Sequence, residues 1–162
     1  MISWLKGQII QKWQLSSKQG VVLNVNCIGY EIHLLSKQRD KIEIDNSKSI
    51  EFWIHQINRE DCTNLYGFYE VSQRDIFRLI ISVNGIGPQI GLALLEDFEV
   101  AQLVKAIEEN DLTLLTKSQG IGKRIAERLV VELKNKLQQF KENSKTIIVN
   151  QNSNGSNQFA KY

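Results

Sequence analysis

Two short glycine-containing stretches hold the residues whose types and spacing could do chemistry. Residues 85–95 read GIGPQIGLALL and residues 120–130 read GIGKRIAERLV, so the second stretch begins 35 residues after the first. Glycine, isoleucine and leucine recur at the same offsets in both. Glycine reaches backbone angles that other residues avoid, and it lets a partner approach the main chain closely. The repeat therefore predicts one backbone-binding turn that is used twice.

A helical pattern follows each turn, and the start of a helix can bind an anion. The first N–H groups of a helix have no partner within the helix, and the helix dipole leaves this end partly positive. Together these features suit a phosphate group. The candidate backbone-binding residues are Gly85, Ile86 and Gly87 in the first copy, and Gly120, Ile121, Gly122, Lys123 and Arg124 in the second.

The two copies differ in charge. The first has Pro88 and Gln89 where the second has Lys123 and Arg124. Residues 117–136 contain six basic and two acidic side chains, although the formal net charge of the whole chain is only +2. We therefore expect the first copy to bind mainly through its amides, and the second to add an attraction that depends on salt.

Three kinds of site fit a repeated glycine turn. A dinucleotide-binding loop needs a preceding strand and the spacing G-x-G-x-x-G, whereas Gly85 follows a helical pattern and begins G-x-G-x-x-x-G. Two helix corners that only pack together are the second possibility, with Val83 anchoring the first and Ser118 in its place in the second. Duplication, flanking helices and local basic charge favour the third, a helix-hairpin-helix module that grips a nucleic-acid backbone without reading its sequence.

The secondary structure that must position these turns is expected to change from strands to helices near residue 70. The earlier part has about five short stretches rich in β-branched and aromatic residues, which indicates a small β-barrel. Within one of them, Ile32 alternates with the polar neighbours Glu31 and His33, the period of a half-buried strand. Ser72 is the predicted N-cap of the first long helix, with Asp75 three residues later.

Helices then continue to about residue 141, and the longest carries an apolar stripe at a spacing of four residues. We expect a barrel domain over residues 1–66, a helical domain over 67–142 and a flexible linker over 143–162, which is rich in Asn, Ser and Gln. The stripe consists of Ile125, Leu129, Leu133 and Leu137. The fold class is therefore α+β.

The composition points away from several other classes of protein. Hydrophobic residues make up 42% of the chain and charged residues 23%, as is usual for a globular domain. An apolar run long enough for a membrane span is missing, as is a secretory signal, so we expect a cytoplasmic protein without membrane contact. Cys27, Cys62, His33 and His55 lie too far apart to predict a metal site, and we expect no cofactor.

Four stretches together resemble the RuvA family, the junction-binding subunits of the bacterial RuvAB branch-migration complex. They cover the chain from residue 1 to about residue 140, in the same order, and read GYEIHLL, REDCTNLYGF, VNGIGPQIGLALL and GIGKRIAERLVVELKNKL. The resemblance implies an N-terminal five-stranded OB-like barrel, an all-α domain with two helix-hairpin-helix motifs, and a third domain that this chain is expected to lack.

The resemblance also implies partners. These are four-way junction DNA, a RuvB-type AAA+ motor ATPase that docks on the third domain, and a RuvC-type resolvase; the assembly is a homotetramer or an octamer. Glu60 and Asp61 match the family's acidic pin near the centre of the tetramer, although adjacent carboxylates in a turn are commonly just solvated. Gln89 departs from the family, which usually has a basic residue there.

With the hairpin repeat, the resemblance implies a non-catalytic scaffold that holds Holliday junctions open for ATP-driven branch migration in recombination and repair. The chain has no Walker-type phosphate loop, so ATP hydrolysis must come from a partner. Two alternatives stay open. One is a helix-hairpin-helix glycosylase or lyase, although residues 126–140 contain no Asp. The other is an OB-fold binder of single-stranded DNA, which would need exposed aromatic side chains such as those of Trp4, Trp13 or Trp53.

Overall fold

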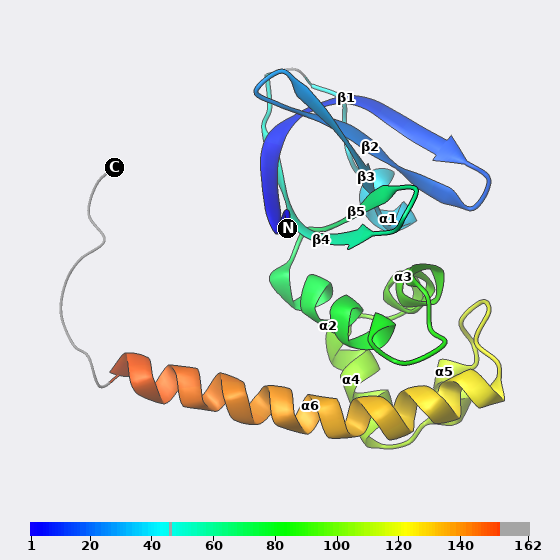
Figure 1. The fold of residues 1–162 in the computed structure, drawn as a ribbon. Coiled ribbons are helices and arrows are strands. Elements are labelled where there is room, and N and C mark those ends of the chain that lie inside the picture. Colours follow the sequence, from blue (N-terminus) through cyan, green and yellow to red (C-terminus); the bar gives the residue numbers. More distant parts are fainter. Residues whose placement is uncertain (46, 153–162) are drawn as a thin grey trace.

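A β-barrel followed by a layer of helices makes up the chain (Figure 1). The computed structural model describes the backbone of residues 1–45 and 47–152, and side chains as far as Leu137. The strands are β1 (Trp4–Leu15), β2 (Lys18–Val25), β3 (Ile28–His33), β4 (Ile50–Asn58) and β5 (Thr63–Phe68). The helices are α1 (Ser36–Arg39), α2 (Val71–Ile81), α3 (Pro88–Asp97), α4 (Val100–Glu108), α5 (Leu112–Leu115) and α6 (Lys123–Asn152).

The five strands close into a barrel in the order β1-β2-β3-β5-β4. Neighbouring strands are antiparallel except β3 and β5, which run parallel. β1 is long enough to pair with both β2 and β4, and its register shifts between Ile9 and Gln11, where a bulge bends the strand. The predicted α+β class is confirmed, and the barrel is of the OB type.

Each domain has its own apolar core. In the barrel, alternate residues of the strands point inward, and Val21, Leu23, Ile32, Phe52 and Ile54 are fully buried. The helical core contains three of the four predicted stripe residues of α6, while the fourth is partly buried against it. Leu35, Tyr66 and Phe68 of the barrel belong to this second core, so the two domains share apolar packing.

Aromatic rings form much of that shared packing. Phe77 of α2 lies 5.0 Å from Phe68 and 5.3 Å from Tyr66, measured between ring centroids. His33, expected to alternate outward, is only 7% exposed because Trp13 and Tyr66 cover it, with centroids 4.9 Å and 5.0 Å away. The period-2 pattern identified the strand but could not show that side chains of β1 and β5 cover its outer face.

Two predicted helix limits differ from the structure. The prediction of Ser72 as an N-cap is wrong: α2 begins at Val71 after Glu70, and the Ser72 hydroxyl donates to the Glu70 carboxylate. The carboxylate of Asp75 instead pairs with Arg74 and Arg78, so it takes no part in a cap.

α6 extends ten residues into the segment predicted as a linker. Glycine and proline are missing from residues 123–154, so nothing in the sequence interrupts the helix there. Residues 153–162, the remainder of the predicted linker, lie outside the described residues. None of the helices in the described part of the chain is long and apolar enough to cross a membrane.

Candidate nucleic-acid interface

The repeated sequence forms two turns of the same conformation. We call residues 83–87, between α2 and α3, the first hairpin, and residues 118–122, between α5 and α6, the second hairpin. Gly85 has a φ of 78° and Gly120 a φ of 80°, which lie in the left-handed region that favours glycine. One hydrogen bond closes each turn, from Ile86 N–H to the Val83 carbonyl and from Ile121 N–H to the Ser118 carbonyl, both 3.1 Å long.

The predicted site residues fall into two groups by exposure. All four glycines are exposed, as are Lys123 and Arg124. Ile86 and Ile121 are 6% and 4% exposed, and their N–H groups close the turns. The isoleucines therefore anchor each hairpin to the core, and the surface offered to a partner consists of glycine backbone and the start of the next helix.

The free amides differ between the hairpins. Among the described residues, hydrogen-bond partners are lacking for the N–H groups of residues 122–124 in the second hairpin, and of Gly87 and Gln89 in the first. Pro88 is the first residue of α3 and has no N–H, whereas Lys123 in the same position of α6 has one. The first hairpin therefore presents one amide fewer as well as less charge.

Two basic residues of α6 form hydrogen bonds to the connection between α2 and α3. Arg128 donates through Nη1 to the carbonyl of Asn84 at 2.9 Å, and Lys136 donates through Nζ to the carbonyl and hydroxyl of Ser82 at 3.1 Å and 2.8 Å. These contacts hold the residues around the first hairpin. This role was not predicted from the sequence, since the contacts span 44 and 54 residues and no local pattern indicates them.

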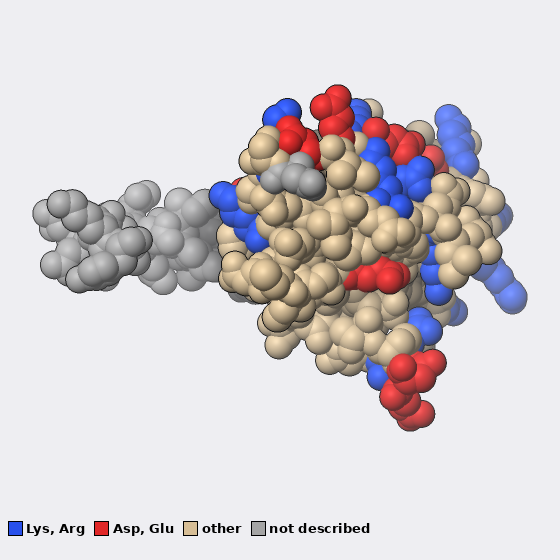
Figure 2. All heavy atoms as spheres, turned by 90° about the horizontal axis from the view of Figure 1, so that it is seen from above, with Lys and Arg blue, Asp and Glu red and all other residues tan. Residues whose placement is uncertain are grey.

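The second hairpin, α3 and the barrel border one hollow of about 360 Å³. Gln89 and Ile90 line it from the start of α3, Gln119 and Gly120 from the second hairpin, and residues 17–19 from the β1–β2 turn and the start of β2. In Figure 1 the α2–α3 and α5–α6 connections lie toward the same end of the helical layer. Figure 2 shows basic side chains projecting at the end of the molecule opposite the grey segment. The second hairpin, the start of α3 and the barrel thus contribute to one surface.

Glu60 and Asp61 occupy the turn between β4 and β5. The turn is closed by a hydrogen bond from Arg59 N–H to the Cys62 carbonyl at 2.8 Å. Both carboxylates are exposed, and neither forms an ion pair with another described residue. They therefore present negative charge on the exposed β4–β5 turn of the barrel.

His55 joins the barrel to the helical domain. Its Nδ1 accepts a hydrogen bond from Arg78 Nε at 3.2 Å, and its ring lies against Phe77. Burial, followed by the charges of Arg78 and Arg74, lowers the pKa of His55, which keeps the ring neutral and able to accept this bond. Burial likewise lowers the pKa of His33. Groups of three or more His, Cys, Asp or Glu that could hold a metal ion do not occur in the described residues.

The tryptophans are only partly available for stacking. Trp4 is exposed, whereas the ring of Trp53, its partner across the strands, lies 5.0 Å under the guanidinium of Arg74. Trp13 donates through its indole nitrogen to the Val21 carbonyl and packs on His33. These rings do not form an open row on one face of the barrel, as a single-strand binder would require.

An OB-type barrel followed by paired glycine hairpins defines a two-domain protein of the tandem helix-hairpin-helix class. Residues 1–67 match the family model described as RuvA N terminal domain, and residues 77–135 match the SAM-like helix-hairpin-helix tandem. The chain is 66% identical over 162 residues to a Holliday junction branch migration complex subunit RuvA of Prochlorococcus marinus (strain NATL2A), covering all of this chain and 71% of the relative.

Two further relatives bear the same name. One, from Synechococcus sp. (strain CC9311), is 47% identical over 137 residues, which cover 85% of this chain and 62% of the relative. Another, from Prochlorococcus marinus (strain MIT 9211), is 46% identical over 144 residues, which cover 89% of this chain and 64% of the relative. The chain belongs to the RuvA family.

Proposed function

We propose that this chain binds Holliday junctions as the junction-binding component of a branch-migration complex, acting in recombination and DNA repair. One observation carries the proposal: two hairpins of equal backbone geometry each leave amides free, in a chain 66% identical to a protein named for this role. Contacts to phosphates position DNA without reading bases. Recognition then depends on the shape of the junction, not on its sequence.

The second hairpin is proposed to supply most of the charge-dependent grip. Residues 122–124 offer three free amides, and the side chains of Lys123 and Arg124 are exposed beside them. A helix N-terminus with added cations is a strong site for a phosphate. In the first hairpin, Gly85 and Gly87 act through backbone approach and Gln89 adds no charge.

Glu60 and Asp61 are proposed to act as an acidic pin. In a tetramer, two carboxylates from each of four protomers would surround the crossover and repel phosphates there, which separates the strands and disfavours ordinary duplex. Repulsion of this kind changes specificity more than affinity. The fourfold homotetramer, with an octamer as the larger alternative, is part of the same proposal because fourfold symmetry matches a four-armed ligand.

The chain is proposed to be non-catalytic, with an ATP-driven motor of the RuvB type pulling the bound arms and a RuvC-type resolvase as a further partner. The glycosylase or lyase interpretation is not favoured by the RuvA relatives, and neither is the single-strand binder. Assembly with these partners rests on the name of the relatives, which places them in a branch-migration complex.

A direct test compares the affinity of the chain for a four-way junction and for linear duplex of the same sequence, together with its solution mass with and without the junction. We expect a strong preference for the junction, little dependence on base sequence and four protomers per junction. Equal affinity for the two DNAs would remove the proposed function. A monomer in both conditions would remove the scaffold arrangement.

The pin has its own test in the paired substitution Glu60→Gln and Asp61→Asn. We expect linear duplex to bind more tightly while the affinity for the junction changes little. The ratio of junction to duplex affinity should therefore decrease. Glu43→Gln, which neutralises another exposed carboxylate of the barrel, should leave the preference as it is. An unchanged preference in the double variant would contradict the pin assignment.

A further inference from the structure

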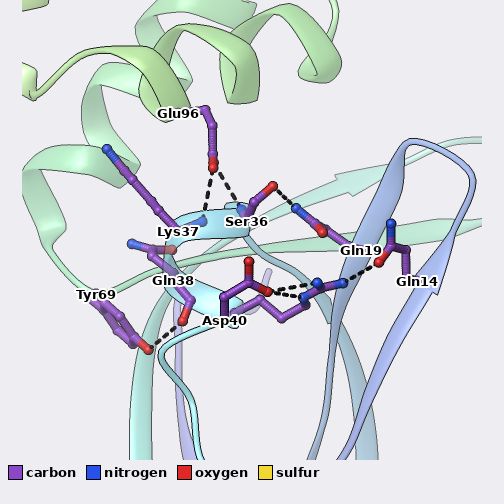
Figure 3. Close-up of polar contacts among 9 residues, drawn as sticks. Gln14, Gln19, Ser36, Lys37, Gln38, Asp40, Tyr69 and Glu96 are labelled. Atoms are coloured by element: carbon purple, nitrogen blue, oxygen red, sulfur yellow. Dashed lines mark hydrogen bonds and ion pairs between the residues drawn. The ribbon is translucent and has the colours of Figure 1, made fainter.

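α1 is a single helical turn inserted between β3 and β4, and it contacts the helical domain at several points (Figure 3). The carboxylate of Glu96, in the last turn of α3, accepts hydrogen bonds from the N–H groups of Ser36 and Lys37 at 2.9 Å and 3.0 Å. Lys37 Nζ also lies 3.3 Å from the carboxylate of Glu99, which precedes α4. α1 is therefore attached to the ends of two helices of the other domain.

Glu96 supplies what α1 lacks in its own sequence. Leu35 occupies the N-cap position and cannot accept a hydrogen bond through its side chain. The first N–H groups of a helix need an acceptor from elsewhere, and a carboxylate at this end is further favoured by the helix dipole. Glu96 meets both needs from 60 residues away in the chain, with one oxygen on each N–H.

The contact at α1 is a second attachment between the domains, separate from the aromatic packing. Within residues 1–45 and 47–152, the chain passes from the barrel to the helical domain once, at residues 69–70, where β5 ends and α2 begins. Phe77 packs on Phe68 and Tyr66 close to that crossing. Gln38 with Gln73 and His55 with Arg78 also join the domains, but α2 makes both of these contacts. An attachment at the end of α3 therefore opposes rocking of the domains about α2.

α3 connects this attachment to the proposed DNA-binding surface. Its first residue, Pro88, directly follows the first hairpin, and Glu96 lies at its other end. The barrel that Glu96 holds carries Glu60 and Asp61 on the β4–β5 turn. The position of the hairpin relative to these carboxylates therefore depends on how firmly the end of α3 is held to α1.

We propose that Glu96 is a positioning residue for junction selectivity, which locks the barrel and the helical domain at the angle that sets the acidic turn against the hairpins. The inference rests on the proposed function, since selectivity presumes junction binding. Removal of the Glu96 carboxylate leaves each hairpin intact, so binding to a linear duplex arm persists. What disappears is the fixed spacing between the hairpins, which hold the arms of a junction, and the acidic turn, which repels phosphates at the crossover.

The test uses Glu96→Ala and Glu96→Gln in the full chain, with Asp97→Ala as the matched control. Asp97 is the next carboxylate on α3, is exposed, and has no partner among the described residues, so the control removes the same charge without the contact. We expect the ratio of junction to duplex affinity to fall about tenfold in Glu96→Ala, within the range of coupling between sites in proteins. Glu96→Gln keeps one acceptor oxygen, so its ratio of junction to duplex affinity should lie between those of Glu96→Ala and the wild type. Asp97→Ala should have the same ratio as the wild type.

A second measurement needs no DNA. Spin labels on Cys27, in the β2–β3 turn of the barrel, and on a cysteine introduced by Glu109→Cys after α4 report the distance between the domains, with Cys62→Ser removing the other thiol. We expect a narrow distance distribution in the wild type and in Asp97→Ala, and a broader one in Glu96→Ala. Circular dichroism establishes that each variant is folded.

The outcomes separate the two proposals. A wild-type chain without junction preference removes the proposed function and, with it, the role of Glu96 in selectivity, while the distance measurement still decides whether Glu96 locks the domains. A wild-type preference that survives unchanged in Glu96→Ala overturns the inference and leaves the proposed function standing. Equal loss of junction and duplex binding in Glu96→Ala also overturns it, because the residue would then act on the fold as a whole.

Discussion

The first and second hairpins have one backbone geometry and different surroundings. Their glycines share φ values of 78° and 80°, and each turn closes with the same 3.1 Å hydrogen bond. The first is anchored by Val83, begins its helix with a proline, and is held by Arg128 from α6. The second has a buried serine as anchor, and its Gly120 has open space where Gly85 faces that arginine.

The two copies thus share the conformation of the turn but differ in charge and in the contacts that hold each hairpin in place. The hairpin held by side chains of another helix offers fewer amides and no cation of its own. The hairpin with three free amides and two exposed cations is anchored by Ile121 in the core, and among the described residues its backbone accepts no hydrogen bond from a side chain of another helix. We infer that the first contributes position and the second contributes affinity, and the following substitutions test that division.

The largest effect is expected from Lys123→Ala with Arg124→Ala. Removing two charge-assisted hydrogen bonds of about 1.5 kcal/mol each corresponds to about 100-fold weaker DNA binding. The slope of log affinity against log salt should flatten by about 0.9 for each phosphate that is no longer neutralised. Gln89→Ala, at the position in the first hairpin that matches Arg124, is the control and should change neither. Fluorescence anisotropy titrations over a salt series measure both quantities.

The reciprocal substitution places the second hairpin's charge on the first. Pro88→Lys with Gln89→Arg adds two cations and one amide N–H, so binding should tighten by about tenfold and the salt slope should steepen. Two results would contradict the proposal that the second hairpin supplies the affinity. One is an equal loss of DNA affinity in the Lys123/Arg124 and Gln89 variants, and the other is no gain of DNA affinity in the Pro88/Gln89 variant.

An intermediate effect is expected from exchanging the anchors. Val83 is 1% exposed, and Val83→Ser buries a hydroxyl in an apolar core, which should lower the free energy of unfolding by about 2 kcal/mol. Ser118 is 3% exposed, and its hydroxyl lacks a hydrogen-bond partner among the described residues. Ser118→Val should therefore raise the free energy of unfolding by about 1 kcal/mol.

Urea denaturation of both variants measures these changes. DNA affinity serves as the control, since neither side chain reaches the surface and binding should stay close to the wild type. A destabilised Ser118→Val variant would show that the serine hydroxyl is satisfied in solution, and the two anchors would then be equivalent.

The smallest effect is the difference between Gly85→Ala and Gly120→Ala. Both substitutions strain a positive φ and should cost about 1 to 2 kcal/mol. A Cβ on Gly85 would also lie 2.8 Å from the guanidinium of Arg128, which must move and give up its bond to Asn84, whereas nothing lies within 4 Å at Gly120. We expect Gly85→Ala to cost about 1 kcal/mol more.

A double-mutant cycle with Arg128→Ala isolates that difference. In the Arg128→Ala background the two glycine substitutions should have equal effects on the free energy of unfolding. A difference that persists without the arginine would show that the hairpins already differ in their own backbone strain.

The sequence predicted the features that depend on local chemistry. Glycine at residues 85 and 120 indicates a backbone angle that other residues avoid, and the apolar stripe of α6 indicates a buried helix face. The hairpins and the helix were therefore both expected. The order of barrel and helices followed from the change of apolar period near residue 70. Lys123 and Arg124 were expected to add charge at the second turn, and both side chains are exposed beside it.

Features that depend on the approach of distant elements could not be predicted. The bond between Arg128 and Asn84 spans 44 residues, and the contact of Glu96 with α1 spans about 60, so each exists only once the helices are packed. Burial of His33 likewise depends on Trp13 and Tyr66 from other strands. The sequence shows that these residues can donate or accept, and the fold decides with whom.

The bonds from α6 to the first hairpin also constrain the order of folding. The carbonyls of Ser82 and Asn84 find their donors on Lys136 and Arg128, which leave the ribosome some fifty residues later. Contacts that close a long loop form after local ones, since the entropy of closure must be lost first. The first hairpin is therefore synthesised first but acquires its hydrogen bonds from α6 last. A chain interrupted before residue 128 would contain this hairpin without the bonds from Arg128 and Lys136.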